Sequence, residues 1–280
     1  MAVVAAAFDY AFQFGWIGVA FALVFAGIAS FVSYWNSDKV ALSLSHAHPA
    51  DRATYARLYN LVEGLTIASG LPMPALYIVD DPAPNAFATG RDPKHASIAV
   101  TSGLLEKMNR IELEGVLAHE LSHVKNYDIR VSSIAVCLVG VVAALSDIGI
   151  RMFIFGGSRR NNNNGGGDSN AIMMVLAFIV IILAPLMATI MQLAVSRKRE
   201  ALADVSAVEM TRYPPGLISA LEKLRDDQTS VKVNSRATAH LWIEEPMDHY
   251  EGDNKKKSRW SHLFDTHPPI EDRIAALREM

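Results

Sequence analysis

Two histidines separated by three residues form the strongest chemical pattern in the chain. His119 and His123 enclose the run His-Glu-Leu-Ser-His. Positions four apart lie on one face of an α-helix, so both imidazoles can bind a single zinc ion. Glu120 directly follows the first histidine, where its carboxylate can act as general base toward the attacking water. The pattern therefore predicts a zinc-dependent hydrolase.

A catalytic zinc ion usually has three protein ligands and one water, so two histidines leave one ligand to be found. The other histidines and several acidic residues are candidates, and we favour Glu200. Asp204 lies four positions further on the same expected helix, where it can hydrogen-bond a ligand histidine and set its tautomer. Because Glu200 closely follows one apolar segment and His123 closely precedes another, we expect both at a similar depth beside a membrane.

The composition indicates a membrane protein and excludes an electrostatic case for nucleic-acid binding. Of the 280 residues, 51% are hydrophobic, and the mean hydropathy of +0.18 is high for a soluble chain of this length. The net charge of −3 shows no excess of basic residues, so we expect no nucleic-acid partner. The single cysteine, Cys137, excludes an internal disulfide and fits a reducing compartment.

Three apolar segments are long enough to cross a bilayer. The first is Gly15 to Tyr34, which we expect to be a retained anchor and not a cleaved signal peptide, because no basic residue precedes it. The others are Val131 to Phe155 and Ala171 to Ala194, joined by the low-complexity loop 156–170. Basic residues cluster after the first span and after the third, so the positive-inside rule places the polar parts of the chain in the cytoplasm.

These spans divide the chain into four expected parts. They are an N-terminal transmembrane anchor (1–35), a first cytoplasmic catalytic part with the sheet and the zinc helix (36–130), a transmembrane hairpin (131–195) and a second cytoplasmic catalytic part with the third ligand (196–280). The two catalytic parts must meet for Glu200 to join the histidines.

Periodicity predicts the elements of the first catalytic part. A helix is expected from Ala53 to Ser69, before Gly70, and three short strands follow at Ala75 to Val79, Asn85 to Gly90 and Ala96 to Val100. Asn109 and Glu112 resemble a capping box, which starts the zinc helix near Arg110. The strands should form a small sheet beside that helix.

The second catalytic part is expected to be helical with one long loop. Helices are predicted from Glu200 to about Thr211, after the break at Pro214-Pro215, and in the tail that follows His267. The stretch from Asp226 to Arg259 mixes acidic and basic runs, which predicts a solvated, partly disordered loop.

Several motifs together resemble the HtpX-type membrane zinc peptidases, which are gluzincins related to the CAAX prenyl proteases. The similarity covers nearly the whole chain in the same order, and it is carried by Asn85-Ala-Phe-Ala-Thr-Gly90, His119-Glu-Leu-Ser-His123, Ser196-Arg-Lys-Arg-Glu200-Ala-Leu-Ala-Asp204 and His267-Pro-Pro-Ile-Glu-Asp-Arg273. One feature differs, because typical members have two spans before the catalytic domain and this chain has room for one complete span there.

The resemblance implies one zinc ion per subunit. Its ligands would be His119, His123 and Glu200, with Glu120 as the general base and Asp204 hydrogen-bonded to a ligand. The fold class it implies is mainly α, with transmembrane helices and a cytoplasmic zincin-like α+β metalloprotease domain that contains a small sheet.

The resemblance also implies how substrate is bound and processed. His267 and Arg273 would face the metal, where either can stabilise the developing oxyanion. We expect a substrate to add as an extended strand to a sheet edge formed by Asn85, Ala86, Phe87, Ala88 and Thr89. The expected enzyme is a metalloendopeptidase of EC 3.4.24 type in the bacterial inner membrane, in contact with the lipid bilayer. There it would cleave misfolded or damaged membrane and cytosolic proteins in protein quality control and stress response.

Two other functions are open at this point. A membrane scaffold with a structural zinc ion would need a closed site of four protein ligands, and Glu120 would be dispensable. An intramembrane protease would need the zinc helix itself to lie in lipid. Arg110, Glu112, Glu114 and Lys125 oppose that arrangement, since charges inside a bilayer cost several kcal/mol.

Overall fold

The computed structural model describes residues 31–32, 34–135, 197–227, 229, 242 and 269–280. The chain divides into two compact units, Met1–Asn36 with Cys137–Ile190 and Ser37–Val136 with Met191–Met280, and nearly all described residues belong to the second. Within the described ranges, no helix is both long and apolar enough to cross a bilayer. The three predicted spans and the loop between the second and third lie almost entirely outside these ranges.

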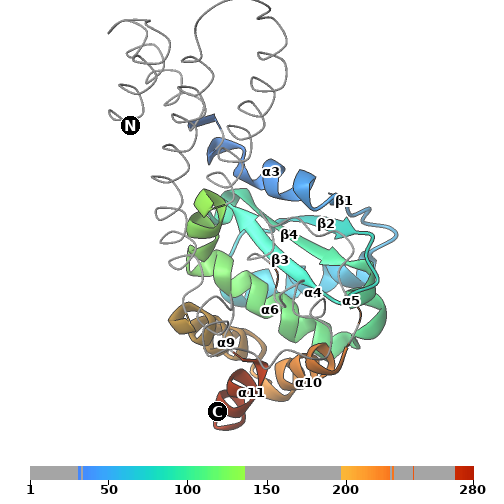
Figure 1. Ribbon diagram of the computed structural model, residues 1–280, viewed down its shortest axis with the longest axis vertical. Coiled ribbons are helices and arrows are strands. Elements are labelled where there is room, and N and C mark those ends of the chain that lie inside the picture. Colours follow the sequence, from blue (N-terminus) through green and yellow to red (C-terminus); the bar gives the residue numbers. More distant parts are fainter. Residues whose placement is uncertain (1–30, 33, 136–196, 228, 230–241, 243–268) are drawn as a thin grey trace, which may run out of the picture. The chain divides into compact units, whose positions relative to one another are not determined.

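A four-stranded mixed sheet forms the middle of the second unit (Figure 1), with the strand order β1-β2-β4-β3. The strands are β1 (His48–Pro49), β2 (Ala75–Val79), β3 (Ala86–Gly90) and β4 (Ala96–Thr101). β2 and β4 run parallel, with Ala75 opposite Ser97, whereas β3 runs antiparallel to β4, with Ala86 opposite Val100. β3 is therefore an edge strand, as a substrate-binding strand must be.

Helices account for most of the remaining described chain. They are α3 (Ser37–Leu44), α4 (Ala56–Ser69), η1 (Pro93–His95, a 3₁₀ turn), α5 (Ser102–Lys107), α6 (Arg110–Lys125), α9 (Arg197–Thr211), α10 (Pro214–Asp226) and α11 (Ile270–Arg278). Helix α6 is central, because it packs against α4, α9, α10 and strand β3. The coarse prediction of a mainly helical fold with a small sheet is confirmed.

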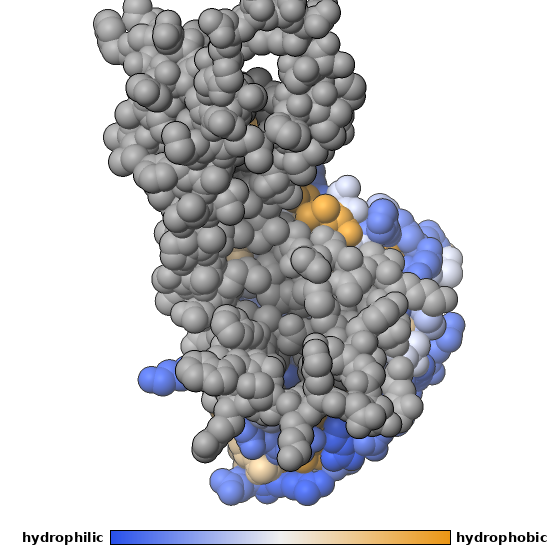
Figure 2. Space-filling model, in the orientation of Figure 1, coloured by the Kyte–Doolittle hydropathy of each residue, from blue (hydrophilic) through white to orange (hydrophobic). Residues whose placement is uncertain are grey.

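The two faces of the sheet pack against different elements. Successive side chains of a strand point to opposite faces. Ala86 and Ala88 of β3 accordingly join the large core cluster with residues of α4 and α6. Phe87 points the other way, into a smaller cluster with Ala41 and Leu42 of α3. Most of the described surface visible in Figure 2 is hydrophilic, as expected when apolar side chains fill these two clusters.

Helix α6 begins at the predicted capping box. The Asn109 side chain accepts hydrogen bonds from the backbone N–H groups of Ile111 and Glu112, and the Glu112 carboxylate accepts one from the Asn109 N–H at 2.8 Å. Further along, a Cβ at Gly115 would lie 2.8 Å from the backbone nitrogen of Leu217 in α10. The absence of a side chain at that position therefore lets the two helices approach closely.

The predicted solvated loop from Asp226 to Arg259 is wrong at Trp242, whereas the Asp226 side chain, at the end of α10, is 67% exposed. Trp242 has a relative exposure of 0%, and its ring meets Phe87 edge-on with centroids 4.7 Å apart. Asp227 accepts a hydrogen bond from Lys107 Nζ at 2.7 Å. The many charged residues of this stretch led to the prediction of a solvated loop, although Trp242 packs against Phe87 on the second face of the sheet.

Most predicted boundaries agree with the structure to within a few residues. Strand β2 is confirmed at both ends, and β3 and β4 each differ by one residue. Pro214 and Pro215 occupy the first turn of α10 and do not precede it, because proline lacks only an N–H that the first turn leaves unpaired. Helix α3, strand β1 and helix α5 were not predicted, since each is too short for periodicity to identify.

Candidate metal centre

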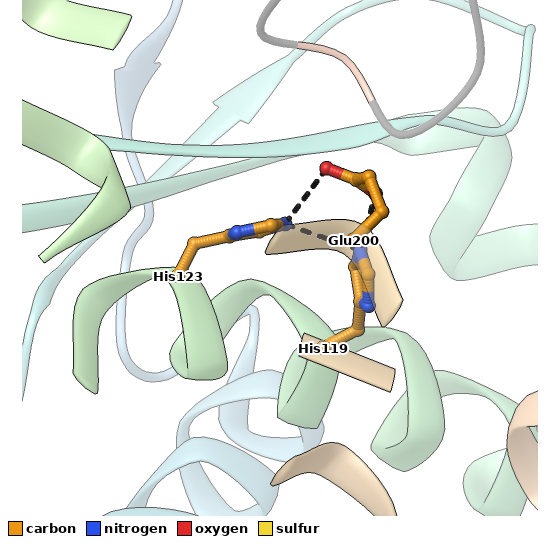
Figure 3. Close-up of side chains that lie close together, drawn as sticks. All are labelled: His119, His123 and Glu200. Atoms are coloured by element: carbon orange, nitrogen blue, oxygen red, sulfur yellow. Dashed lines mark hydrogen bonds and ion pairs between the residues drawn. The ribbon is translucent and has the colours of Figure 1, made fainter. Parts of the chain in front are cut away.

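Helices α6 and α9 bring together three side chains that could hold a metal ion. His119 and His123 project from α6, and Glu200 projects from the first turn of α9 toward them (Figure 3). The two Nε2 atoms are 3.2 Å apart. Glu200 places Oε2 at 3.5 Å from His119 Nε2 and Oε1 at 3.6 Å from His123 Nε2. The third residue chosen from the sequence thus lies beside both histidines.

These separations suit a tetrahedral zinc ion. Zinc bonds of about 2.0–2.2 Å at a tetrahedral angle place neighbouring ligand atoms about 3.3–3.6 Å apart. The two Nε2 atoms, 3.2 Å apart, lie close to that range. Glu200 places a different oxygen near each histidine, and with one ligand atom from each residue the three atoms lie within 4.8 Å of one another. The donor set of two imidazoles and one carboxylate is also one that zinc accepts. Among the described residues the group has these three members, so a fourth position is left for water.

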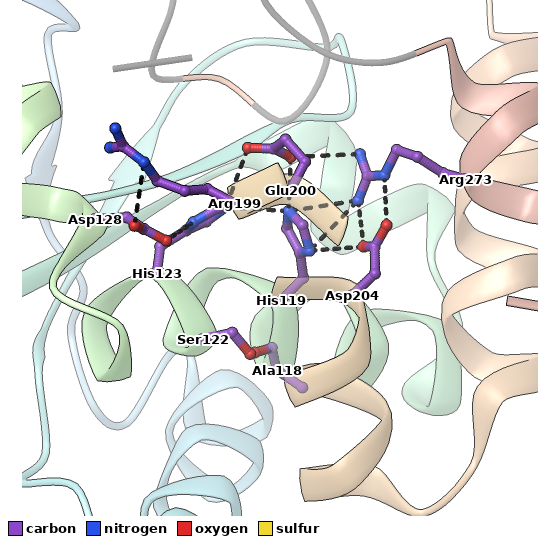
Figure 4. A network of polar contacts seen from close by, with 9 residues as sticks. All are labelled: Ala118, His119, Ser122, His123, Asp128, Arg199, Glu200, Asp204 and Arg273. Atoms are coloured by element: carbon purple, nitrogen blue, oxygen red, sulfur yellow. Dashed lines mark hydrogen bonds and ion pairs between the residues drawn. The ribbon is translucent and has the colours of Figure 1, made fainter. Parts of the chain in front are cut away.

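Asp204 holds His119 from the side away from Glu200. Its Oδ1 lies 2.9 Å from His119 Nδ1 (Figure 4). Arg273 of α11 grips the same carboxylate with two donors, Nη2 to Oδ1 at 2.7 Å and Nε to Oδ2 at 2.9 Å. All three side chains are at most 5% exposed. This buried chain of contacts fixes the orientation of the His119 ring and leaves its Nε2 directed at the metal position.

The ionisation of this group follows from burial and from its charges. Burial and the charge of Arg273 lower the pKa of His119, but hydrogen bonds to Asp204 and Glu200 outweigh them and raise it to about 9. Burial raises the pKa of Asp204, and the Arg273 charge and the His119 contact more than reverse that, so the pKa lies well below its usual range. Asp204 is therefore ionised and available to accept hydrogen bonds from both partners.

His123 has its own carboxylate partner, which sequence reasoning missed. Its Nδ1 lies 3.1 Å from Asp128 Oδ2, and Asp128 Oδ1 lies 3.8 Å from Arg199 Nε of α9. Asp128 follows helix α6 after a turn in which Tyr127 has φ of 61°. A carboxylate five residues after the second histidine is the sequence signal that could have identified it.

Of the three residues predicted to act on the substrate, the structure describes Glu120 and Arg273. Glu120 is 2% exposed, and Arg273 is 4% exposed. Burial lowers the pKa of Arg273, but the charges of Asp204, Glu200 and Glu120 raise it above the ordinary value. Arg273 Nη1 lies 4.0 Å from Glu200 Oε2, while the other guanidinium donors bind Asp204. His267 lies outside the described residues.

The predicted substrate strand lies at the sheet edge nearest to helix α6. β3 contacts α6 directly, and all five of its residues are buried. Asn85, just before the strand, exchanges hydrogen bonds with Thr101 at the end of β4, from Asn85 N to Thr101 Oγ1 at 2.9 Å and from Thr101 N to Asn85 O at 3.0 Å. The run from Asn85 to Thr89 is thus buried beside helix α6, which carries His119 and His123.

A family comparison agrees with this geometry. Residues 52–280 match the model of peptidase family M48, and this range contains the candidate metal centre and strands β2, β3 and β4. The chain therefore belongs to peptidase family M48, a family of metalloproteases.

Within that family the chain groups with the HtpX-type proteases. It is 48% identical over 260 residues to a protease HtpX homolog of Tropheryma whipplei (strain Twist), covering 93% of this chain and 84% of the relative. A protease HtpX homolog of Lactobacillus helveticus is 46% identical over 268 residues, covering 95% and 87% respectively. Another from Dictyoglomus thermophilum is 43% identical over 269 residues, covering 96% and 84%.

The fold also resembles that of a solved protein. The crystal structure of Ste24p from S. mikatae superposes with a TM-score of 0.55 at 17% sequence identity. The match covers 98% of this chain and 61% of that chain, so this chain spans less than two thirds of Ste24p. At this identity the likeness concerns the fold alone.

Proposed function

We propose that this protein is a membrane-bound zinc metalloendopeptidase of EC 3.4.24 type. The observation that carries the proposal is the approach of His119, His123 and Glu200, whose ligand atoms all lie within 4.8 Å of one another. Membership of a metalloprotease family supports protein or peptide substrates. Each histidine also has a carboxylate on its other nitrogen, which is the usual support for a metal-binding imidazole.

In the proposed mechanism, His119, His123 and Glu200 would hold a zinc ion, which would make a water molecule more acidic and polarise the scissile carbonyl. Glu120 takes the proton from the attacking water and passes it to the leaving amine. Asp204 holds His119 through its Nδ1 and is itself held by Arg273. We retain His267 and the remaining donor of Arg273 as the groups proposed to stabilise the oxyanion.

The proposed substrate is an extended segment of a misfolded or damaged protein. It would pair with the outer edge of β3, because main-chain pairing binds peptides with little demand on their sequence. The edge position of β3 and its contact with α6 support this arrangement. A role in protein quality control would follow from such low selectivity.

We propose a multi-pass location in the bacterial inner membrane, with both catalytic parts in the cytoplasm. The parts would be those expected from the sequence: an anchor at 1–35, a hairpin at 131–195 and catalytic parts at 36–130 and 196–280. Phe31 and Trp35, at the end of the proposed anchor, are 60% and 48% exposed, and their rings stack with centroids 5.0 Å apart. Exposed aromatic side chains at that point support an interfacial anchor.

The test is a comparison of the zinc-loaded full chain with its Glu120→Gln variant. We expect both proteins to contain one zinc ion per chain by elemental analysis, and we expect only the parent to cleave unfolded casein. The variant keeps its ligands but loses the group that accepts the proton, so its rate should fall by at least about 100-fold. Equal cleavage by both proteins would refute the proposal.

The same experiment separates the enzyme from a zinc-stabilised scaffold. A scaffold would need a closed site, whereas the metal-binding group has three members among the described residues. If the parent binds zinc, unfolds when zinc is removed, and cleaves nothing, the scaffold is the better description.

A further inference from the structure

The register of the sheet determines which main-chain groups of β3 point outward. In an antiparallel pair, alternate residues exchange hydrogen bonds with the neighbouring strand, and those between them direct N–H and C=O to the other side. Asn85 is bonded to Thr101, since Thr101 N donates to Asn85 O at 3.0 Å. The main-chain N–H and C=O groups of Phe87 and Thr89 therefore also point toward β4. The outward groups belong to Ala86, Ala88 and Gly90.

Ser133 already binds both outward groups of Gly90. Its hydroxyl donates to Gly90 O at 3.0 Å, and the Gly90 N–H reaches the same oxygen at 3.4 Å. Ser133 lies in the helical stretch 128–135 that follows the metal-binding helix, and it is 0% exposed. One residue beyond the strand, Arg130 Nε donates to Arg91 O at 2.8 Å. This end of the edge is closed by the protein itself.

At the other end of the β3 edge, one of the two outward main-chain groups of Ala86 is hydrogen-bonded within the protein. The N–H of Ala86 donates to the Asn85 side-chain oxygen at 3.0 Å, which leaves the Ala86 C=O. No described residue hydrogen-bonds the outward N–H or C=O of Ala88, or this C=O of Ala86. Three neighbouring main-chain groups on this edge thus have no hydrogen-bond partner among the described residues. They are buried, since Ala86 is 0% and Ala88 6% exposed, and a buried main-chain group without a partner is costly.

We propose that Ser133 sets the length of the substrate-binding edge. A substrate strand pairs with the Ala88 N–H, the Ala88 C=O and the Ala86 C=O, and its pairing stops where Ser133 occupies Gly90. Ser133 is a specificity-determining residue, because it limits main-chain recognition to a short extended segment of the substrate. This inference rests on the proposed peptidase function and refines its substrate class.

The length of the substrate-binding edge can be measured by counting the substrate N–H groups whose removal weakens binding. The two free carbonyls, on Ala86 and Ala88, accept from two substrate N–H groups that lie two residues apart, whichever way the substrate runs. The probe is a fluorescent peptide that spans a cleavage site mapped in casein, methylated at one backbone nitrogen at a time. Its dissociation constant is measured by anisotropy with the zinc-loaded, full-length Glu120→Gln variant, which holds the peptide without cutting it.

We expect N-methylation at two residues, spaced by two, to weaken binding by about tenfold each, because each removes one hydrogen bond. In the Ser133→Ala variant of the same protein, Gly90 is released and a third residue at the same spacing becomes sensitive. Ser133→Thr keeps the hydroxyl and is the matched control, so it should show two sensitive residues. Zinc content and circular dichroism establish that each variant is folded.

Three or more sensitive residues in the parent, no sensitive residue in it, or an unchanged pair in Ser133→Ala would each overturn the inference. The parent scan decides the matter even if Ser133→Ala does not fold. These outcomes differ from a failure of the proposed function, which would appear earlier as the absence of casein cleavage by the zinc-loaded parent.

Discussion

The two histidines of the candidate metal centre lie on the same helix, yet their rings are held by different contacts. The ring of His119 is 1% exposed and is fixed by Asp204 and Arg273, which come from α9 and α11. Arg273 lies 154 positions away from His119 in the chain. The ring of His123 is 15% exposed and is fixed by Asp128, five residues further on. One ligand depends on distant folding and the other mainly on local structure.

Because of this difference, we expect changes around His119 to affect both the stability of the fold and the affinity for metal, and changes around His123 to affect mainly the affinity. A buried ion pair that joins two helices affects both quantities, because breaking it leaves an uncompensated charge in the interior. A partly exposed contact within one segment should affect the metal site alone. The predictions below test that separation, in order of decreasing effect.

The largest effect is expected for Asp204→Ala. Arg273 would then be a buried guanidinium without its bidentate partner, and we expect a loss of about 3–5 kcal/mol in the free energy of unfolding. The zinc affinity should also fall about 10–100-fold, since His119 loses the carboxylate on Nδ1. Thermal unfolding and competition with a zinc chelator measure the two quantities.

The double variant Asp204→Ala, Arg273→Met is the control for this prediction. It removes the unpaired charge, so stability should largely return while zinc affinity stays low. If stability and affinity recovered together, the two roles assigned to the pair would not be separable and the comparison would fail.

A smaller effect is expected for Asp128→Ala. We predict a loss of about tenfold in zinc affinity, because His123 Nδ1 loses its partner at 3.1 Å. The melting temperature should change by only a degree or two, since the hydrogen bond to His123 is local and the ion pair with Arg199 of α9 is long, at 3.8 Å. Asp128→Asn retains an acceptor oxygen and should keep most of the affinity. A large drop in melting temperature for Asp128→Ala would contradict the local assignment.

Glu112 offers a test at the opposite end of the same helix. Its carboxylate is 3% exposed and accepts hydrogen bonds from Lys223 Nζ and Ser219 Oγ, each at 2.7 Å. Burial raises the pKa of Glu112, but its bonds to Lys223, Asn109 and Ser219 lower it below the ordinary value of 4.5. A lowered carboxyl pKa stabilises the fold above that value, and the contribution is lost as the pH falls through the folded-state pKa.

We therefore expect Glu112→Gln to be less stable than the parent at pH 7 by about 1–3 kcal/mol. The gap should narrow as the pH is lowered below the ordinary pKa of 4.5, because the parent carboxyl becomes protonated. Zinc affinity at pH 7 should not change. Melting curves of both proteins between pH 7 and pH 3.5 measure the gap, and one that widened toward acid would show that the sign is wrong.

Local patterns predicted much of the fold. The capping box at Asn109 and Glu112 set the start of α6, and strand β2 agrees with its predicted bounds. Short elements were missed because a few residues carry too little periodicity, as at α3 and β1. Trp242 was missed for another reason. It stands in a run of only three apolar residues, Leu241 to Ile243, inside a polar and charged stretch, and its partner Phe87 lies on a strand far away in the chain.

In the candidate site, the sequence predicted the possible metal ligands but not the contacts that hold them. The spacing of His119 and His123 identifies a shared face of a helix, and Glu200 with Asp204 shows the same spacing on a second helix. Nothing in the sequence indicates that Arg273 donates two hydrogen bonds to Asp204, since these bonds depend on where α11 packs. The roles of these residues, of Asn85 to Thr89 and of His267 stay predictions until the variants are measured.

The sequence by itself determined the chemistry available to this protein, because the types and spacing of ligands on a helix follow from backbone geometry that is the same in every protein. It also determined the family, through motifs in a constant order. Only the tertiary structure decided which carboxylate supports which histidine, and that Ser133 closes the end of the β3 edge at Gly90. Those contacts depend on how helices and strands pack, and packing is set by the whole core and not by any one segment.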